Sequence, residues 1–408
     1  MRAALLGLMA CSMLAPAAWG AEQDYSLIER GRYLATIGDC TACHTAPGGK
    51  LMAGGRAIET PFGNIVAPNI TPDRETGIGA WSDDAFYASM HDGKTARGEN
   101  LYPAMPYPYF TKTRRDDVMA IRAWLNTLEP VVNRVDANQL PFPFSIRAAM
   151  TGWNALFFQA GEWQDDTQKS AEWNRGGYLV EGLAHCGACH NAKNALGGDE
   201  SGSRLQGFAL QGWFAPAITS GNGVGLDKWT VDDIVEYLKT GTNRFATAAG
   251  PMAEAVSDST QHISLADLRA MAVYLKDQKG PAAEKRQAMA ASDPVMQAGE
   301  AIYVDKCAAC HTMNGAGIAR LFPTLSASPS VEARDPLSVL HVILNGTRAA
   351  HTPYAPTSPA MPAFGWELTD VQVAAVATYV RNAWGNAAAP VTAGDVSSVR
   401  KNLAARRE

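Results

Sequence analysis

The pattern Cys-X-X-Cys-His occurs three times in this chain and constrains its fold more than any other feature. The copies occupy residues 40–44, 186–190 and 307–311, and successive copies start 146 and 121 residues apart. They use six of the seven cysteines in a chain of 408 residues. Separations of this size match a small domain, so the repeat predicts three similar domains.

Three kinds of site are built from paired cysteines, and they require different surroundings. Structural zinc needs four ligands, usually two cysteine pairs or one pair with two spaced histidines. A thioredoxin-like redox pair is favoured by a strand-then-helix context. Covalent haem c needs two thiols that add to the haem vinyl groups and an adjacent histidine for the iron. A three-residue step on a helix places both sulfurs on one face.

In this chain the three cysteine pairs are far apart and a histidine directly follows each pair. The motifs therefore predict three covalently bound haem c groups as cofactors. The predicted attachment residues are Cys40, Cys43, Cys186, Cys189, Cys307 and Cys310, and the predicted proximal iron ligands are His44, His190 and His311. His185, directly before the second motif, is expected to face solvent.

A methionine beside a proline recurs after each motif. Met105, Met252 and Met361 lie 61, 62 and 50 residues after their proximal histidines, before an amphipathic helix. Thioether sulfur suits haem iron, and Met/His ligation raises the reduction potential. A lone methionine usually packs in a core, but the recurrence favours distal ligands. His351 is the rival for the third iron.

Two other residue types recur at matched places. Pro68, Pro216 and Pro323 follow the motifs in loops. In small c-type cytochromes such a proline carbonyl accepts a hydrogen bond from the proximal imidazole; the alternative is an ordinary turn proline. The recurring arginines are Arg97, Arg244 and Arg348. They could pair with the haem propionates, or they could simply be solvated surface residues.

Helical patterns dominate, so the predicted fold is all-α, with three tandem class I-type cytochrome c domains. The predicted domains span residues 21–130, 166–285 and 286–386. An aromatic-rich connector, 131–165, is expected to pack between domains, and residues 387–408 form a polar, basic tail.

The N-terminus indicates export. Residues 1–20 have Arg2, an apolar run and small residues before Ala21, which predicts a signal peptide. A lipoprotein with Cys11 as the lipidated residue is the alternative. The net charge of −5 gives no basic footprint for nucleic acid, and no later apolar run is long enough to span a membrane. We therefore expect a periplasmic protein.

The chain resembles the trihaem cytochrome c subunits of bacterial periplasmic alcohol, aldehyde, gluconate and sugar-alcohol dehydrogenase complexes. The resemblance covers nearly the whole mature chain and is most specific at residues 97–112, 138–150, 153–158 and 174–190. It implies an electron relay from a catalytic subunit that carries flavin, a quinoprotein cofactor or molybdenum to ubiquinone. It also implies a possible small third subunit and attachment to the outer face of the inner membrane. Family members carry a C-terminal apolar or amphipathic anchor, whereas this chain ends VRKNLAARRE.

His/Met coordination saturates the iron, which suits electron transfer without bond-making on a substrate. We therefore expect a subunit without catalytic residues of its own. Two alternatives remain at this point: a free periplasmic electron shuttle, and a multihaem peroxidase-type enzyme with one open iron.

Overall fold

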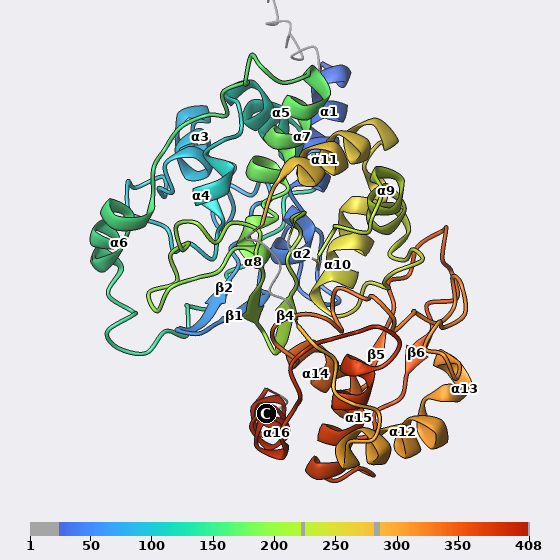
Figure 1. The fold of residues 1–408 in the computed structure, drawn as a ribbon. Helices are drawn as coiled ribbons and strands as arrows, with labels where there is room; N and C mark the ends of the chain where they lie inside the picture. Colours follow the sequence, from blue (N-terminus) through green and yellow to red (C-terminus); the bar gives the residue numbers. More distant parts are fainter. Residues whose placement is uncertain (1–23, 222–224, 281–285, 407–408) are drawn as a thin grey trace, which may run out of the picture.

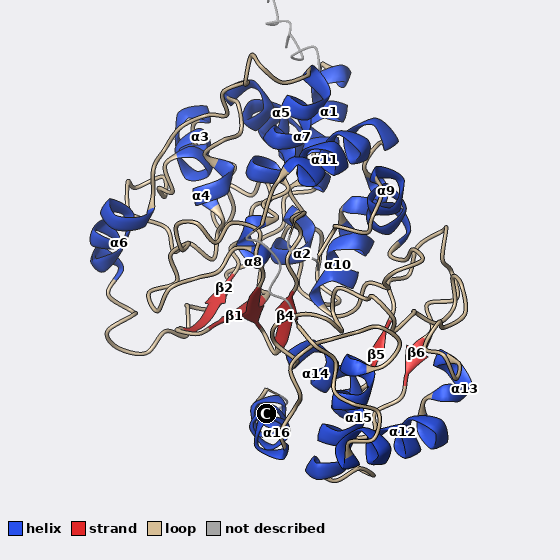
Figure 2. Cartoon of the chain, viewed as in Figure 1, coloured by secondary structure: helices blue, strands red, loops and turns tan. Residues whose placement is uncertain are grey.

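The computed structural model describes residues 24–221, 225–280 and 286–406. The predicted signal peptide, its cleavage point and Cys11 lie outside these residues. Helices predominate, which confirms the helical prediction in its coarse form (Figure 2). The structure adds three short antiparallel ribbons, β1–β2, β3–β4 and β5–β6, that the sequence patterns did not predict.

The first predicted domain begins with a helix that runs into the first motif. Asp24 caps this helix, accepting hydrogen bonds from the backbone N–H groups of Ser26 and Leu27. Its elements are α1 (Tyr25–Ile37), α2 (Cys40–His44), β1 (Ala57–Thr60), β2 (Gly63–Val66), α3 (Asp83–His91), α4 (Tyr107–Phe110) and α5 (Arg115–Leu125).

The connector and the second predicted domain follow. Ser170 caps the helix that leads to the second motif, and a π-helical turn continues it. The elements are η1 (Arg147–Ala149), α6 (Met150–Phe157), α7 (Ala171–Tyr178), η2 (Leu179–Leu183), α8 (Gly187–His190), β3 (Phe208–Leu210), β4 (Trp213–Ala215), α9 (Val231–Thr240), α10 (Pro251–Asp258), η3 (Thr260–His262) and α11 (Leu265–Asp277).

The third predicted domain and the tail complete the described chain. Asp293 caps the helix before the third motif, and Thr369 starts the last domain helix with a capping box. The elements are α12 (Pro294–Lys306), α13 (Ala308–His311), α14 (Leu337–Asn345), β5 (Thr347–Arg348), β6 (Ala360–Met361), α15 (Asp370–Asn382) and α16 (Ala393–Ala405).

The same helix crossing occurs three times. The helix before each motif, α1, α7 or α12, packs on a later helix, α5, α11 or α15. At each crossing a glycine meets a backbone carbonyl, and a Cβ on that glycine would overlap the carbonyl oxygen. The pairs are Gly31 with Ala120, Gly176 with Ala270 and Gly299 with Ala375. Glycine therefore allows the helix backbones to approach closely in front of each motif.

Two large hydrophobic cores form. One is continuous across the first two predicted domains and contains Leu34 and Ile121 together with Leu183 and Ile263. The other belongs to α12, α14, α15 and α16. Figure 1 shows the red and orange C-terminal helices as a separate group below the rest. The third domain is joined to the second where the His341 ring stacks on Trp213, with centroids 4.0 Å apart.

The connector makes contacts on both sides. Asn154 accepts a hydrogen bond from the Tyr107 hydroxyl (2.6 Å), and the Trp153 indole N–H donates to the Leu196 carbonyl (2.9 Å). Much of the connector nevertheless faces solvent, including Phe142 and Leu156.

The tail differs from the expected polar segment. Thr392 and Asp395 form a capping box that starts α16, and Val396 and Leu403 are buried on α14 and α15. Arg400 turns inward and donates to the Asp370 carboxylate (2.9 Å). Apolar residues at helical spacing were visible in this tail, and their burial outweighs its basic composition. Within the described residues, no helix has the length and apolar character needed to cross a membrane.

Candidate functional site

Each motif lies on, or starts at the cap of, a short helix that follows the first helix of a crossing pair, with η2 between the two helices at the second motif. The first motif forms α2, whereas Cys186 and Cys307 each cap the helix that carries the rest of their motif. All six motif cysteines are free thiols. Five of them are partly covered and Cys310 is exposed. The helical placement brings two thiols and a histidine together at each of the three places, as haem c attachment requires.

Each motif histidine is held by the proline that follows it. The distance from the imidazole Nδ1 to the proline carbonyl oxygen is 2.8 Å for His44 and Pro68. It is 2.7 Å for His190 and Pro216, and 3.0 Å for His311 and Pro323. The predicted hydrogen bond is therefore present at all three motifs.

This hydrogen bond determines which nitrogen is available. A carbonyl can only accept, so Nδ1 carries the proton and Nε2 keeps a free lone pair. Burial lowers the pKa of His44, His190 and His311, and the proline carbonyl partly opposes that shift. The rings are thus neutral donors of defined orientation, which is the form that binds iron.

Most of the motif thiols have a raised pKa, whereas the thiols of a redox pair have a lowered one. Burial raises the pKa of Cys40 and Cys186 to about 12, and that of Cys43 and Cys307 to about 11. A reactive redox pair needs a lowered pKa, because the thiolate is the nucleophile. The raised pKa of these thiols therefore argues against a redox pair.

The candidate distal methionines lie at the edges of the cores. Met105 is half-buried in the turn before α4, and Met252 is half-buried near the start of α10. Met361 is half-buried in β6, opposite Thr347 of β5. Their role as iron ligands stays a prediction.

The rival residues have other surroundings. His351 is exposed in a loop. Arg244 is held by both carboxylate oxygens of Asp233 at 2.8 Å, and Arg348 donates to the Ser358 carbonyl (3.1 Å). Arg97 is exposed. Two of the three recurring arginines thus have partners within the protein.

His185 does not face solvent as expected. Its ring makes an edge contact with Phe110 of α4, with centroids 5.3 Å apart, and burial lowers its pKa. The second motif abuts the first domain at this point, and the local sequence could not show that.

The structure brings the first two motifs together and leaves the third apart. The Cys189 thiol lies near enough to Cys43 to contribute to raising its pKa. Figure 1 shows α2 and α8 side by side near the centre of the molecule, with α13 at its lower right margin.

Arg56 is a site residue that the sequence patterns did not reveal. Its guanidinium donates to the Ala42 carbonyl inside the first motif (2.5 Å) and pairs with Glu254, two residues after Met252. It therefore ties the first motif to the helix that carries the second candidate methionine. Beside it, Asp39 has a pKa raised to about 8, chiefly by burial and then by Asp258 and Glu254. No repeat or motif in the sequence marked these residues.

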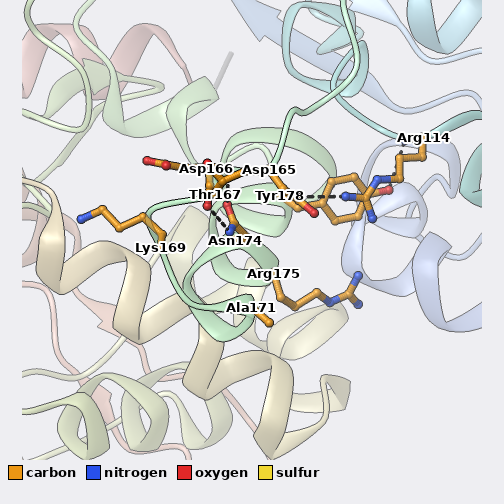
Figure 3. Close-up of a pocket in the computed structure, with 9 residues that line it drawn as sticks. All are labelled: Arg114, Asp165, Asp166, Thr167, Lys169, Ala171, Asn174, Arg175 and Tyr178. Atoms are coloured by element: carbon orange, nitrogen blue, oxygen red, sulfur yellow. Dashed lines mark hydrogen bonds and ion pairs between the residues drawn. The ribbon is translucent and has the colours of Figure 1, made fainter.

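A polar cavity of about 370 Å³ lies elsewhere, between the start of α5, the end of the connector and α7 (Figure 3). Arg114 pairs there with Asp165 at 3.0 Å, and its guanidinium lies over the Tyr178 ring. No cysteine, histidine or methionine lines this cavity, so it is separate from the three motifs.

Comparison with known proteins agrees with the motif geometry. The cytochrome c family model matches residues 296–384. The gluconate 2-dehydrogenase cytochrome c subunit of Pantoea cypripedii is 38% identical over 398 residues, which cover 92% of this chain and 90% of that protein. The alcohol dehydrogenase (quinone) cytochrome c subunit of Gluconobacter oxydans is 37% identical, covering 98% and 87%.

A third relative is longer. One of the subunits of the nicotinate dehydrogenase of Pseudomonas putida is 41% identical over 369 residues, which are 88% of this chain and 30% of that protein. This chain therefore matches less than a third of that relative's length.

Proposed function

Since the chain belongs to the family of cytochrome c subunits of dehydrogenase complexes, we propose that it carries electrons through three haem c groups from its partner dehydrogenase to ubiquinone. It is an electron-transfer subunit that relays electrons from a dehydrogenase partner. We also propose that the number of haems is three, that the acceptor is a quinone and that the complex has a small third subunit.

One observation carries the haem count. The same arrangement, a glycine-mediated helix crossing followed by a motif whose histidine binds a proline carbonyl, occurs three times. We assign one haem to each of three tandem cytochrome c domains, at 21–130, 166–285 and 286–386. An accidental motif would have neither the crossing nor the oriented histidine.

The chain's own residues would attach each haem, orient its histidine ligand and keep substrate away from the iron. The two cysteines of each motif would hold the haem by thioethers, and the proline would keep the imidazole in one orientation with Nε2 free to bind iron. Met105, Met252 and Met361 would each supply a second protein ligand to the iron in this proposal. Bound haem c supplies one-electron oxidation and reduction. With two protein ligands on each iron, no position would remain for a substrate.

We place the protein in the periplasm, at the outer face of the inner membrane. The N-terminal signal pattern and the need of c-type haem attachment for an exported chain support this location.

We expect mass spectrometry of the mature protein to show three covalent haems and no residues before about Ala21. Replacing Cys307 and Cys310 with alanine should remove one haem and leave two, because each pair acts alone. Two haems in the unaltered protein would contradict the assignment of one haem to each motif. A retained, lipidated Cys11 would instead establish the lipoprotein alternative.

We expect the purified subunit to oxidise no alcohol, aldehyde or sugar acid with a dye acceptor. Its haems should become reduced only when a partner dehydrogenase and its substrate are added, which haem absorbance would follow. Substrate-dependent reduction of the isolated chain would overturn the relay. Purification of the native protein with a dehydrogenase would distinguish a bound subunit from a free shuttle.

A further inference from the structure

Arg56, directly before β1, lies between the first motif and the second domain. Its guanidinium donates one hydrogen bond to the Ala42 carbonyl (2.5 Å) and another to the Glu254 carboxylate (3.0 Å). The Ala42 carbonyl belongs to the peptide bond that precedes Cys43, one of the predicted attachment residues. A haem bound through Cys43 would therefore be anchored beside a positive charge that the motif itself does not supply.

The carboxylate partner of Arg56 comes from the second domain. Glu254 lies in α10, two residues after Met252. α10 packs on α2, and the Ser259 hydroxyl at the end of α10 donates to the Ile37 carbonyl at the end of α1 (3.2 Å). The ion pair thus spans a surface at which the two domains are in contact, and it joins the first motif to the helix that carries Met252.

The groups around Arg56 are acidic. Its hydrogen bond with Glu254 raises the pKa of Arg56, burial partly opposes this shift, and Asp258 of α10 adds to the rise. Burial raises the pKa of Asp39, directly before the motif, and Asp258 and Glu254 raise it further. Arg56 has the opposite effect on Asp39. Three carboxyl groups therefore interact with one guanidinium at the first motif.

A charge at this place affects the two oxidation states of a haem unequally. Ferric haem carries one more positive charge than ferrous haem, so a nearby guanidinium disfavours the ferric form and raises the reduction potential. A carboxylate has the opposite effect. The Arg56 side chain is 33% exposed, so water screens part of its field and the expected effect is moderate.

We propose that Arg56 is a positioning residue of the electron relay, which fixes the first motif to α10 and raises the reduction potential of the haem bound there. This inference rests on the proposed haem at the first motif. Because α2 and α8 lie side by side, the charge of Arg56 would favour reduction of the first haem over its neighbour (Figure 1).

Potentiometric titration of the full-length, haem-loaded protein tests the proposal. Arg56→Gln should lower the potential of one of the three haems by about 59 mV, a tenfold change in the equilibrium constant for one electron. Glu254→Gln keeps the shape of the side chain and should raise the same potential by a similar amount. Arg56→Lys keeps the charge and should retain most of the original potential. Arg134→Gln is the matched control, because Arg134 pairs with Glu75 in an ion pair whose two side chains are largely exposed, and it should leave all three potentials unchanged.

Opposite shifts separate the effect of the charge from the effect of the contact. Both glutamine variants break the same ion pair, so a contact that only holds the domains together would shift the potential in one direction or not at all. Shifts of the same sign, or an unchanged potential in the Arg56→Gln protein, would overturn the proposal.

Two further readouts guard against other causes. If Arg56→Gln does not retain three haems, an unchanged potential in the Glu254→Gln protein overturns the proposal by itself. The absorption band of iron–methionine coordination should keep its full intensity in Glu254→Gln, and its loss would trace the shift to Met252 and also overturn the proposal. These potentials are measured without a dehydrogenase, so a failure of partner-driven haem reduction would contradict the relay and leave this inference standing.

Discussion

Replacing Met361 with alanine is expected to lower the reduction potential of one haem by on the order of 0.1–0.3 V, a part of the roughly 0.8 V that axial ligation spans. Thioether ligation favours the reduced iron, so its loss lowers the potential. At about 59 mV per tenfold change for one electron, the equilibrium with the acceptor shifts by about two to five powers of ten.

Haem attachment should survive this substitution. Met361 lies in β6, whereas the predicted attachment cysteines, Cys307 and Cys310, and His311 lie on and before α13. The His311–Pro323 hydrogen bond does not involve the β5–β6 ribbon. Potentiometric titration would show one of three haems displaced. The weak absorption band of iron–methionine coordination should fall by about a third, given three similar sites.

Met313→Ala is the matched control. Met313 is 62% exposed two residues after His311, so its removal should leave all potentials and the band unchanged. An unchanged band in the Met361→Ala protein would assign the third iron to His351 or another ligand.

The motifs and their histidine–proline bonds were predictable because they are local. Two cysteines and a histidine within five residues specify their own chemistry, and the proline that fixes His44 lies only 24 residues along the chain. The helices around them were predictable from apolar periodicity.

The ribbons could not be predicted in the same way. β1 and β2 have four residues each and β5 and β6 only two, too short for an alternating pattern to stand out. The pairing of β1 with β2 depends on the short turn between them, which Gly63 ends with a φ of +119°.

Contacts between domains were also beyond the sequence patterns. Arg56 and Glu254 are 198 residues apart, and neither belongs to a repeat. His185 is covered by Phe110 only because α4 of the first domain meets the second motif. Each of these positions follows from how folded units dock, which no local pattern records.

Gly299→Ala is expected to lower the free energy of unfolding of the C-terminal core by roughly 2–3 kcal/mol, toward the upper end of the range for overpacking. A Cβ at this position would overlap the Ala375 carbonyl oxygen of α15 and lie 2.6 Å from the Tyr379 Cβ. A carbonyl in a helix cannot rotate away, so α12 must move off α15. Met296 and Tyr303, buried on α12, would then lose part of their packing.

Gly152→Ala separates this steric effect from the general effect of glycine in helices. Gly152 lies in α6, and a Cβ there would meet no atom within 4 Å. Alanine should stabilise that helix by up to about 1 kcal/mol, because glycine has the greater freedom in the unfolded chain. Denaturant unfolding followed by circular dichroism and haem absorbance would measure both variants.

Opposite signs of the change in the free energy of unfolding for Gly299→Ala and Gly152→Ala would support the close crossing of α12 and α15. If Gly299→Ala were as stable as the unaltered protein, α12 and α15 would not cross in backbone contact. If it is destabilised as expected, the same substitution at Gly31 and Gly176 should act likewise, because each faces a carbonyl in the same way. The effect should also reach the haem sites, since Cys307 caps α12 and moves with it. A loss of stability at all three positions would show that the same close helix contact is present in front of each motif.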